Sequence, residues 1–234
     1  AFLASLPPEA YRYAVPEPWY TEHHVRRYGF HGTSHRYVTH RTAELLGKSV
    51  EQCNLITAHL GNGCSMTAVQ GGRAIDHTMG MTPLEGLVMG TRCGDIDPAI
   101  VLYMMGRGLD PEEIDRALNK ESGLQGVSQL SNDMRDLLSA AESGHDKADL
   151  AVRLFVYRLL KYVGAFHAVL PSVDALVLTG GIGENSVPVR RLLCQKLQRL
   201  GAIPDDHRND STIRGAVGPI SANGSKLPVW VVPT

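Results

Sequence analysis

Residues Ala175-Leu176-Val177-Leu178-Thr179 run directly into Gly180-Gly181-Ile182-Gly183-Glu184-Asn185, and this combination indicates the fold class of the chain. The apolar run predicts a buried strand. A helix is expected at 187–200, after the glycines. A glycine-rich turn between a strand and a helix presents backbone N–H groups to phosphate, because the helix N-terminus adds positive potential. No Lys-Ser or Lys-Thr follows and GxGxxG is not matched, so neither a Walker loop nor a dinucleotide fingerprint is present. A plain left-handed turn after a strand remains the alternative.

Upstream of this unit, short segments separated by glycine predict an antiparallel meander. The expected strands are Leu55–Leu60, Ser65–Val69 and Arg73–Thr78, and the turns between them are Gly61-Asn62-Gly63 and Gly71-Gly72. Together with the strand at 175–179, they predict an α/β fold with a mixed sheet and flanking helices, in one domain that spans residues 1–234.

Several helices are expected around this sheet. Asp97 and Asp110 each precede a proline, a pattern that favours a capped helix start, so we expect helices at 98–106 and 111–120. A longer helix is expected at 146–170. Near the N-terminus, a helix should run from a cap at Thr33 or Ser34 to about Gly47, after an extended segment at 1–30 with one helical turn at Pro18–His24.

Composition and charge exclude some functional classes. The 234 residues are 43% hydrophobic and 20% charged, with a formal net charge of −1, as in ordinary soluble globular proteins. Without a basic tract, neither nucleic acid nor a membrane surface is an expected partner. Charged residues at Arg153, Arg158 and Lys161 interrupt the apolar span at 150–170, which predicts a packed helix. The four cysteines form no CxxC pair and favour buried thiols in a reducing cytoplasm.

Two glycine-containing segments carry side chains suited to phosphate. In the turn His59-Leu60-Gly61-Asn62-Gly63, backbone amides could wrap a phosphate oxygen while His59 and Asn62 donate from their side chains; a type I′ hairpin at Asn62-Gly63 with a structural histidine is the alternative. In Gly29-Phe30-His31-Gly32-Thr33-Ser34-His35, His31 could donate to a transferring phosphoryl group, whereas His35 is expected to pack on the following helix.

Arg92 is the candidate cation of the site, because it lies between glycines on a predicted loop. A guanidinium presents a planar fork that matches phosphate or carboxylate oxygens. The alternative is a surface arginine that pairs with Asp95. Asp95 and Asp97 could bind a metal in principle, but a helix cap explains Asp97 better.

Seven segments, in order along nearly the whole chain, resemble the signature blocks of acetate and propionate kinases. They are Gly29-Phe-His-Gly-Thr-Ser-His35, His59-Leu-Gly-Asn-Gly63, Thr82-Pro-Leu-Glu-Gly-Leu87, Met89-Gly-Thr-Arg92, Gly94-Asp-Ile-Asp-Pro98, Ser131-Asn-Asp-Met-Arg-Asp136 and Gly180-Gly-Ile-Gly-Glu-Asn185. The resemblance implies an actin-like, sugar-kinase (ribonuclease H-like) ATPase domain, and the reversible reaction of ATP with acetate to give acetyl phosphate and ADP with Mg²⁺.

The resemblance also implies roles for individual residues. His31 would bind the phosphoryl group in flight and Arg92 would neutralise it, while Phe30 and Pro83 would border a pocket for the substrate methyl group. The nucleotide would be held by His59, Gly61, Asn62, Gly63, Asp133, Met134, Arg135, Gly181, Ile182, Gly183 and Asn185. Such positioned donors and positive charge are what phosphoryl transfer requires.

The same resemblance implies that this chain is the second domain, for nucleotide binding and dimerisation, of a two-domain cytoplasmic kinase. The first residue is Ala1, and the family's catalytic Asp lies just upstream of that position. A metal-associated Glu normally follows the last residues, so no Mg²⁺ ligand is assigned here, and the chain alone is expected to have little turnover. Leu3, Ala4 and Cys93 depart from the family's usual His, Gln and Ser. Propionate kinase is the alternative activity, and a non-catalytic dimerisation module is the alternative of another class.

Overall fold

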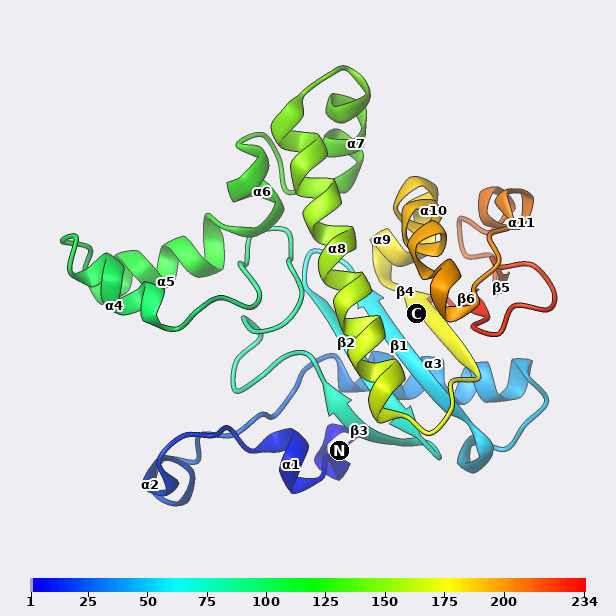
Figure 1. Cartoon of the computed structure of the whole chain (residues 1–234), viewed down its shortest axis with the longest axis horizontal. Coiled ribbons are helices and arrows are strands. Elements are labelled where there is room, and N and C mark those ends of the chain that lie inside the picture. The colour runs from blue at the N-terminus through cyan, green and yellow to red at the C-terminus, as the bar shows by residue number, and fades with distance from the viewer. Residues whose placement is uncertain (1) are drawn as a thin grey trace.

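Six strands form one mixed sheet in a computed structural model of the chain, which describes residues 2–234 (Figure 1). The strand order across the sheet is β3-β2-β1-β4-β6-β5. The strands are β1 (Asn54–Leu60), β2 (Cys64–Gln70), β3 (Arg73–His77), β4 (Ala175–Thr179), β5 (Gly218–Pro219) and β6 (Val229–Val231). The predicted meander and the predicted strand at 175–179 are therefore confirmed.

The parallel centre of the sheet brings distant segments of the chain together. β1 is antiparallel to β2 and parallel to β4, with His59 opposite Thr179 in the register. β4 is parallel to β6, and β5 closes the edge in an antiparallel pair. Because β1 and β4 run the same way, the turn after His59 and the turn after Thr179 leave the sheet at the same edge.

Alternation along the strands divides the core between two faces. Ile56, Ala58 and Leu60 of β1 belong to the main core, which includes the buried face of the long helix α8 (Asp146–Val169). Leu55 belongs to a second core on the other face, with Val38 of α3 (Gly32–Leu45). The sheet thus lies between α8 and α3 (Figure 1). Thr57 and His59 alternate with the main-core residues and face α3, where they are available to polar partners.

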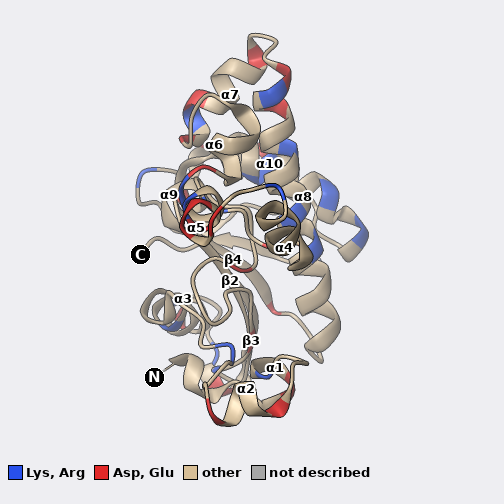
Figure 2. Cartoon of the chain, turned by 90° about the vertical axis from the view of Figure 1, so that its left-hand side faces the viewer, with Lys and Arg blue, Asp and Glu red and all other residues tan. Residues whose placement is uncertain are grey.

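The remaining helices are grouped around these layers, and several of them contribute buried residues to the main core. They are α1 (Pro8–Tyr11), α2 (Glu17–Thr21), α4 (Ala99–Met105), α5 (Pro111–Lys120), α6 (Gly123–Ser128), α7 (Met134–Glu142), α9 (Gly180–Asn185), α10 (Val187–Lys196) and α11 (Asp206–Ser211), with 3-10 turns η1 (Phe2–Ser5), η2 (Val50–Gln52) and η3 (Leu197–Leu200). Both predicted capping aspartates act as expected: Asp97 accepts from the Ala99 N–H, and Asp110 forms a capping box with Glu113. Acidic and basic positions lie close together around α6 and α7 (Figure 2).

Three local predictions need correction, and one alternative considered from the sequence is wrong. α3 begins at Gly32 after His31, without a cap from Thr33 or Ser34, because the Ser34 hydroxyl bonds instead to the Nδ1 atom of His59. The 61–63 turn is not type I′, since neither Asn62 nor Gly63 is among the residues with positive φ in the described chain. The helix predicted at 187–200 ends at Lys196 and continues as η3. The segment at 2–30 holds η1 and α1 besides the expected turn, which is α2.

Candidate functional site

The candidate site lies where β1 and β4 end side by side. The turn Gly61-Asn62-Gly63 follows β1, and α9 follows β4. At Gly180 the two turns touch: a Cβ atom there would lie 2.8 Å from the Leu60 carbonyl oxygen, and the φ of +77° excludes other residues as well. Glycine at this position therefore allows the two turns to pack directly against each other.

His31 and Arg92 converge on the tip of the β1–β2 turn. A Cβ atom built on Gly63 would lie 3.4 Å from Arg92 Nη1, 3.5 Å from His31 Cε1 and 3.6 Å from His31 Nε2. The guanidinium and the outer edge of the imidazole thus face the same small space, which only a glycine leaves open. A guanidinium and an imidazole nitrogen beside the same point form an arrangement that can bind an anionic oxygen.

The His31 side chain is held in place by neighbours on the strands β1 and β2. Its Nδ1 atom lies 2.9 Å from Ser65 Oγ, and its ring stacks on His59 with 4.4 Å between centroids. The backbone of His31 has a φ of 57°, in the left-handed region that non-glycine residues seldom adopt. Strain of this kind persists where the surroundings enforce it and is found preferentially at functional sites.

The electrostatics of the site keep its histidines neutral. Burial, together with the neighbouring His59 and Arg92, lowers the pKa of His31 to about 4. Burial also lowers the pKa of His59, against the opposing effect of Glu184. At neutral pH each ring therefore carries one proton, and Arg92 supplies the positive charge beside Gly63.

Arg92 keeps free donor capacity, because in the described part of the chain its Nε and Nη2 atoms have no hydrogen-bond partner. Its Nη1 atom donates to the Pro83 carbonyl oxygen at 3.2 Å and lies 3.7 Å from Met89 Sδ. Within residues 2–234 it forms no ion pair, so its charge is not neutralised by a carboxylate. The pairing with Asp95 considered from the sequence is wrong, because Asp95 binds Arg158 at 2.9 Å and accepts from the Tyr162 hydroxyl.

An open pocket of about 780 Å³ adjoins this space. Its lining gathers most of the residues predicted to hold a nucleotide, and they come from the β1–β2 turn, α7 and α9. They are Gly61, Asn62, Asp133, Met134, Arg135, Gly181, Ile182 and Asn185. Its volume falls within the ~300–1,000 Å³ usual for small-molecule sites.

The Asn62 side chain is fixed at the junction between the pocket and the His31–Arg92 pair. Asn132 Nδ2 donates to its Oδ1 atom at 3.2 Å, and the Gly90 N–H donates to the backbone carbonyl oxygen of Asn62 at 3.0 Å. A Cβ atom on Gly90 would lie 1.9 Å from Asn62 Oδ1. Glycine at position 90 therefore makes room for the amide of Asn62.

Asp133 and Arg135 form a unit at the start of α7. The Asp133 carboxylate accepts from the backbone N–H of Arg135 at 2.8 Å and from its guanidinium, and the side-chain hydrogen bond lowers the pKa of Asp133. Because the Arg135 side chain is 89% exposed, its planar face remains open to solvent at the rim of the pocket. Met134 between them is buried in the core.

Some predicted residues lie elsewhere than expected. Gly183 is buried, and a Cβ there would contact Leu178, so it packs α9 on β4 and does not line the pocket. The predicted turn at 180–183 is itself helical, and its first N–H is not free, because Gly180 donates to Glu184 Oε1 at 2.8 Å. His59 and Gly63 border the space with His31, whereas Phe30 packs against the main core and Pro83 lies beside Arg92.

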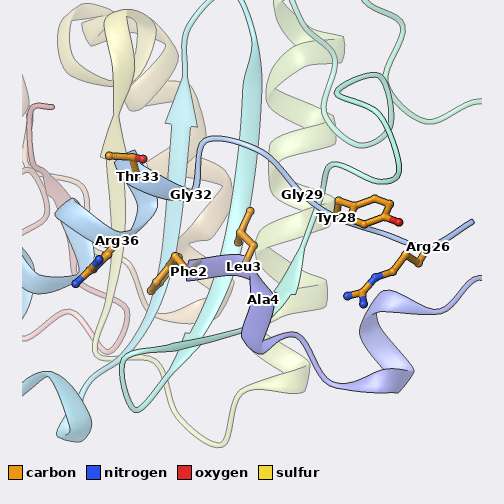
Figure 3. A pocket seen from close by; sticks show the side chains of 9 residues that line it. All are labelled: Phe2, Leu3, Ala4, Arg26, Tyr28, Gly29, Gly32, Thr33 and Arg36. Carbon is orange, nitrogen blue, oxygen red and sulfur yellow. The ribbon is translucent and has the colours of Figure 1, made fainter. Parts of the chain in front are cut away.

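A second cavity, of about 540 Å³, lies beside the same Gly29–His35 segment (Figure 3). Leu3 lies near the middle of the view, and the side chains of Arg26 and Arg36 lie at opposite sides of it. The Leu3 side chain packs under the glycines, since Cβ atoms on Gly29 and Gly32 would meet it at 2.7 and 3.6 Å. None of the predicted catalytic residues lines this cavity.

Sequence analysis missed several residues that shape the site. Ser34 and Ser65 bind the histidine rings, and Asn132 binds Asn62. Further lining of the open pocket comes from Leu138, Ser139, Glu142, Ser186 and Pro188. Ser34 and Asn132 each lie within a family block, and this was the only feature of the sequence that could have indicated them as site residues. Ser65 lies in none of them, so only the alternation of β2 could have placed it on the face toward α3.

Comparison with known proteins agrees along the whole chain. A family model described as the Acetokinase family matches residues 1–234. The acetate kinases of Dictyoglomus thermophilum and Nitratidesulfovibrio vulgaris (strain DP4) are 52% and 55% identical, and each alignment covers 100% of this chain and 58% of the relative. The crystal structure of Porphyromonas gingivalis acetate kinase matches with a TM-score of 0.96 at 46% identity, and that of a Francisella tularensis propionate kinase with 0.94 at 42%. Each structural match covers 100% of this chain and 59% of the solved one.

These matches bear out the fold class predicted from the sequence, and they show that the chain spans about three fifths of the length of its relatives. The chain belongs to the acetokinase family.

Proposed function

We propose that the protein containing this chain transfers the terminal phosphoryl group of ATP to acetate, reversibly, giving ADP and acetyl phosphate. The bond between the γ-phosphorus and the ADP oxygen breaks as an acetate oxygen bonds to that phosphorus. The convergence of His31 and Arg92 on the space beside Gly63 is the observation that carries this proposal. Membership of the acetokinase family, and relatives named acetate kinase, support the same reaction.

The proposed roles follow from position. Arg92 neutralises charge on the phosphoryl oxygens, and His31 donates a hydrogen bond to one of them, contributions that for an arginine reach ~10³–10⁵ in rate. The nucleotide lies in the open pocket, with its phosphates toward Asn62 and its adenosine between α7 and α9. This orientation requires polar groups between the open pocket and the space beside Gly63. The side chain of Asn62 and the backbone amides of the β1–β2 turn are such groups.

Mg²⁺ is proposed to accompany the nucleotide. Among residues 2–234, no group of three or more His, Cys, Asp or Glu side chains is gathered as a metal site. We therefore assign the ion to the nucleotide phosphates and to residues outside this chain. The ion would neutralise phosphate charge, and every role assigned here to His31 and Arg92 stands on their own contacts.

Steady-state assays on the full-length protein test the proposal. ATP-dependent formation of acyl phosphate is expected with acetate, and an Arg92→Ala variant should be at least ~10³-fold slower. No activity with any short carboxylate would refute it. Propionate is the second candidate substrate, because a propionate kinase is among the close structural relatives. The ratio of kcat/KM for the two acids decides between them.

Nucleotide binding can be measured on this chain alone. We propose that it forms the second domain of a two-domain kinase and retains affinity for ADP while having little turnover. Calorimetric titration should therefore detect ADP binding. The absence of binding at millimolar ADP would contradict the assignment of the open pocket, and full turnover by the chain alone would contradict the need for residues outside it.

We further propose that the protein is a homodimer that assembles through the region of α4. Apolar side chains are exposed on and around this helix, at Ile96, Ile100, Leu102, Tyr103 and Met105, and Leu102 is 72% exposed. Figure 1 shows α4 at the end of an arm that extends from the body of the fold. An exposed apolar cluster of this kind suits a second copy of the chain, and a stable two-fold interface buries about 2,000 Å² or more.

Sedimentation at low micromolar concentration tests the dimer. Leu102→Glu is expected to give a monomer, whereas Leu150→Glu, which changes an exposed leucine on α8, should leave the dimer intact. A monomeric unaltered protein would refute this assembly.

None of the helices at residues 2–234 is long and apolar enough to span a membrane, and the cysteines are free thiols. We propose a cytoplasmic location because free thiols are typical of a reducing compartment.

A further inference from the structure

A chain of buried hydroxyl and imidazole groups leads from the middle of the sheet to His31. Thr57 Oγ1 lies 2.8 Å from His35 Nδ1, His35 Nε2 lies 2.7 Å from Ser65 Oγ, and Ser65 Oγ lies 2.9 Å from His31 Nδ1. Thr57, His35 and Ser65 are completely buried. The alternation of β1 and β2 puts Thr57 and Ser65 on the face toward α3, where His35 projects from the first turns of the helix.

The number of protons couples the two histidines. A serine hydroxyl has one proton, so when it donates to one ring it accepts from the other. If Ser65 donates to His31 Nδ1, then His35 Nε2 carries a proton and His31, when neutral, carries its own on Nε2. If Ser65 donates to His35 instead, both rings hold the opposite tautomers. The direction of the chain thus decides which nitrogen of His31 is a donor.

Thr57 sets the direction, because its proton has two acceptors of unequal quality. The His35 Nδ1 atom is 2.8 Å away, whereas the alternative, the Thr67 carbonyl oxygen, is 3.5 Å away. A bond of 2.8 Å is strong for a hydroxyl and a contact of 3.5 Å is marginal. Donation from Thr57 to His35 leaves His35 to donate to Ser65, and Ser65 to donate to His31 Nδ1.

We propose that Thr57, His35 and Ser65 are positioning residues that hold His31 as a neutral imidazole with its proton on Nε2. That nitrogen is the one facing Gly63 beside Arg92. Its use as a donor to a phosphoryl oxygen rests on the proposed function, whereas the tautomer itself is a property of the fold. Arg92 and His59, the groups facing His31 from the neighbouring loop and β1, disfavour a second proton on the ring, so a fixed neutral tautomer is how His31 donates at neutral pH.

The nearby His77 provides a contrasting ring in the same cluster. The backbone N–H of Phe30 donates to His77 Nε2 at 3.0 Å, so that nitrogen has no proton when the ring is neutral. Its proton is therefore on Nδ1, which lies 2.8 Å from Thr67 Oγ1. The two rings are thus expected to hold opposite tautomers, and His77 serves as an internal reference.

Nuclear magnetic resonance of ¹⁵N-histidine-labelled protein at pH 7 tests the assignment directly. Long-range ¹H–¹⁵N correlations distinguish protonated from unprotonated ring nitrogens, and His31→Gln and His77→Gln variants assign the two spin systems. A proton on Nε2 of His31 and on Nδ1 of His77 is the expected result. A proton on Nδ1 of His31, or on both of its nitrogens, would overturn the proposal.

A variant at Ser65 tests the chain independently. In the unaltered protein, the hydrogen bond from Ser65 to the Nδ1 lone pair stabilises the neutral His31 ring. Ser65→Ala removes this hydrogen bond, so the pKa of His31 should rise by about one pH unit. The matched control, Ser34→Ala, removes the hydroxyl bound to His59 and should leave the His31 titration unchanged apart from a small effect through the stacked ring. An unaltered His31 titration in Ser65→Ala would contradict the proposal.

Kinetics on the full-length protein then distinguish the tautomer of His31 from the role of His31 in phosphoryl transfer. Ser65→Ala should lower kcat by roughly tenfold with little change in the KM for ATP, and its rate should gain a new pH dependence at the raised pKa of His31. If the full-length protein has no kinase activity and His31 still shows the expected tautomer, the proposed function fails and the hydrogen-bond chain stands. If the enzyme is active and His31 shows the other tautomer, this inference fails alone.

Discussion

Replacing Gly63 by alanine is expected to block phosphoryl transfer while leaving the fold intact. The new Cβ atom would lie 3.4 Å from Arg92 Nη1 and 3.6 Å from His31 Nε2. An oxygen bound to both donors needs a position ~2.8–3.0 Å from each. A methyl group makes contacts at ~3.5–4.0 Å, so it would occupy the place of that oxygen. Losing one preorganised donor lowers the rate by ~10²–10³, and losing an arginine by ~10³–10⁵. We therefore expect kcat to fall about 10³-fold.

The same substitution should change stability little. Gly63 is outside the positive-φ region, and the nearest atoms to the added methyl belong to side chains at ordinary contact distances. The free energy of unfolding, measured in urea, should change by less than ~1 kcal/mol. Gly164→Ala on α8 is the control, because a Cβ there meets no atom within 4 Å, and it should preserve the rate and stabilise the helix by ~0.5–1 kcal/mol. A folded Gly63→Ala enzyme with an unaltered rate would refute the placement of the phosphoryl group.

Three further predictions concern the surroundings of the site. Arg190 is buried and donates to Asn209 and to backbone carbonyl oxygens near the end of α9. Arg190→Met should therefore lower the free energy of unfolding in urea by ~3–5 kcal/mol, and a loss under ~1 kcal/mol would contradict this. Burial lowers the pKa of His77 to about 3, against ~6.5 when unfolded; the unfolded state then binds more protons between these values, so stability is complete above about pH 6.5 and falls as the pH falls towards 3. His77→Gln should lose less stability than the unaltered protein between pH 7 and 4, and equal losses would argue against this origin. Gly90→Ala should displace the Asn62 amide and weaken ADP binding by about tenfold in calorimetry, and unchanged affinity would remove Asn62 from the nucleotide site.

Local signals in the sequence predicted the regular elements well. The helix at 111–120 and the strand at 175–179 have the predicted bounds, because a capping aspartate before proline and an uninterrupted apolar run are decided by neighbouring residues. The meander was predictable for the same reason, since glycines mark its turns. Helix α7 and the strands β5 and β6 were not predicted. They are short, and their stability comes from packing, of α7 against α8, of β6 against β4 and of β5 against β6.

The site could be predicted only as a set of residues. Family blocks indicated His31, Arg92 and eight of the residues that line the open pocket, but they carried no information on which residues touch. Asp95 shows the difference: it lies three positions from Arg92, yet it binds Arg158 of α8. Gly183 likewise belongs to a glycine-rich block and packs inside the fold. Separation along the chain does not measure distance once strands pair.

The α/β class, the order of the elements and the family could be read from the amino-acid sequence, because periodicity, capping and motif order are properties of local chain segments. That His31 and Arg92 face one point beside Gly63, with Thr57, His35 and Ser65 behind that histidine, became known from the folded chain alone. These contacts join a helix, two strands and a loop. Their geometry depends on sheet register and on which face of each strand meets α3, and no local segment encodes either.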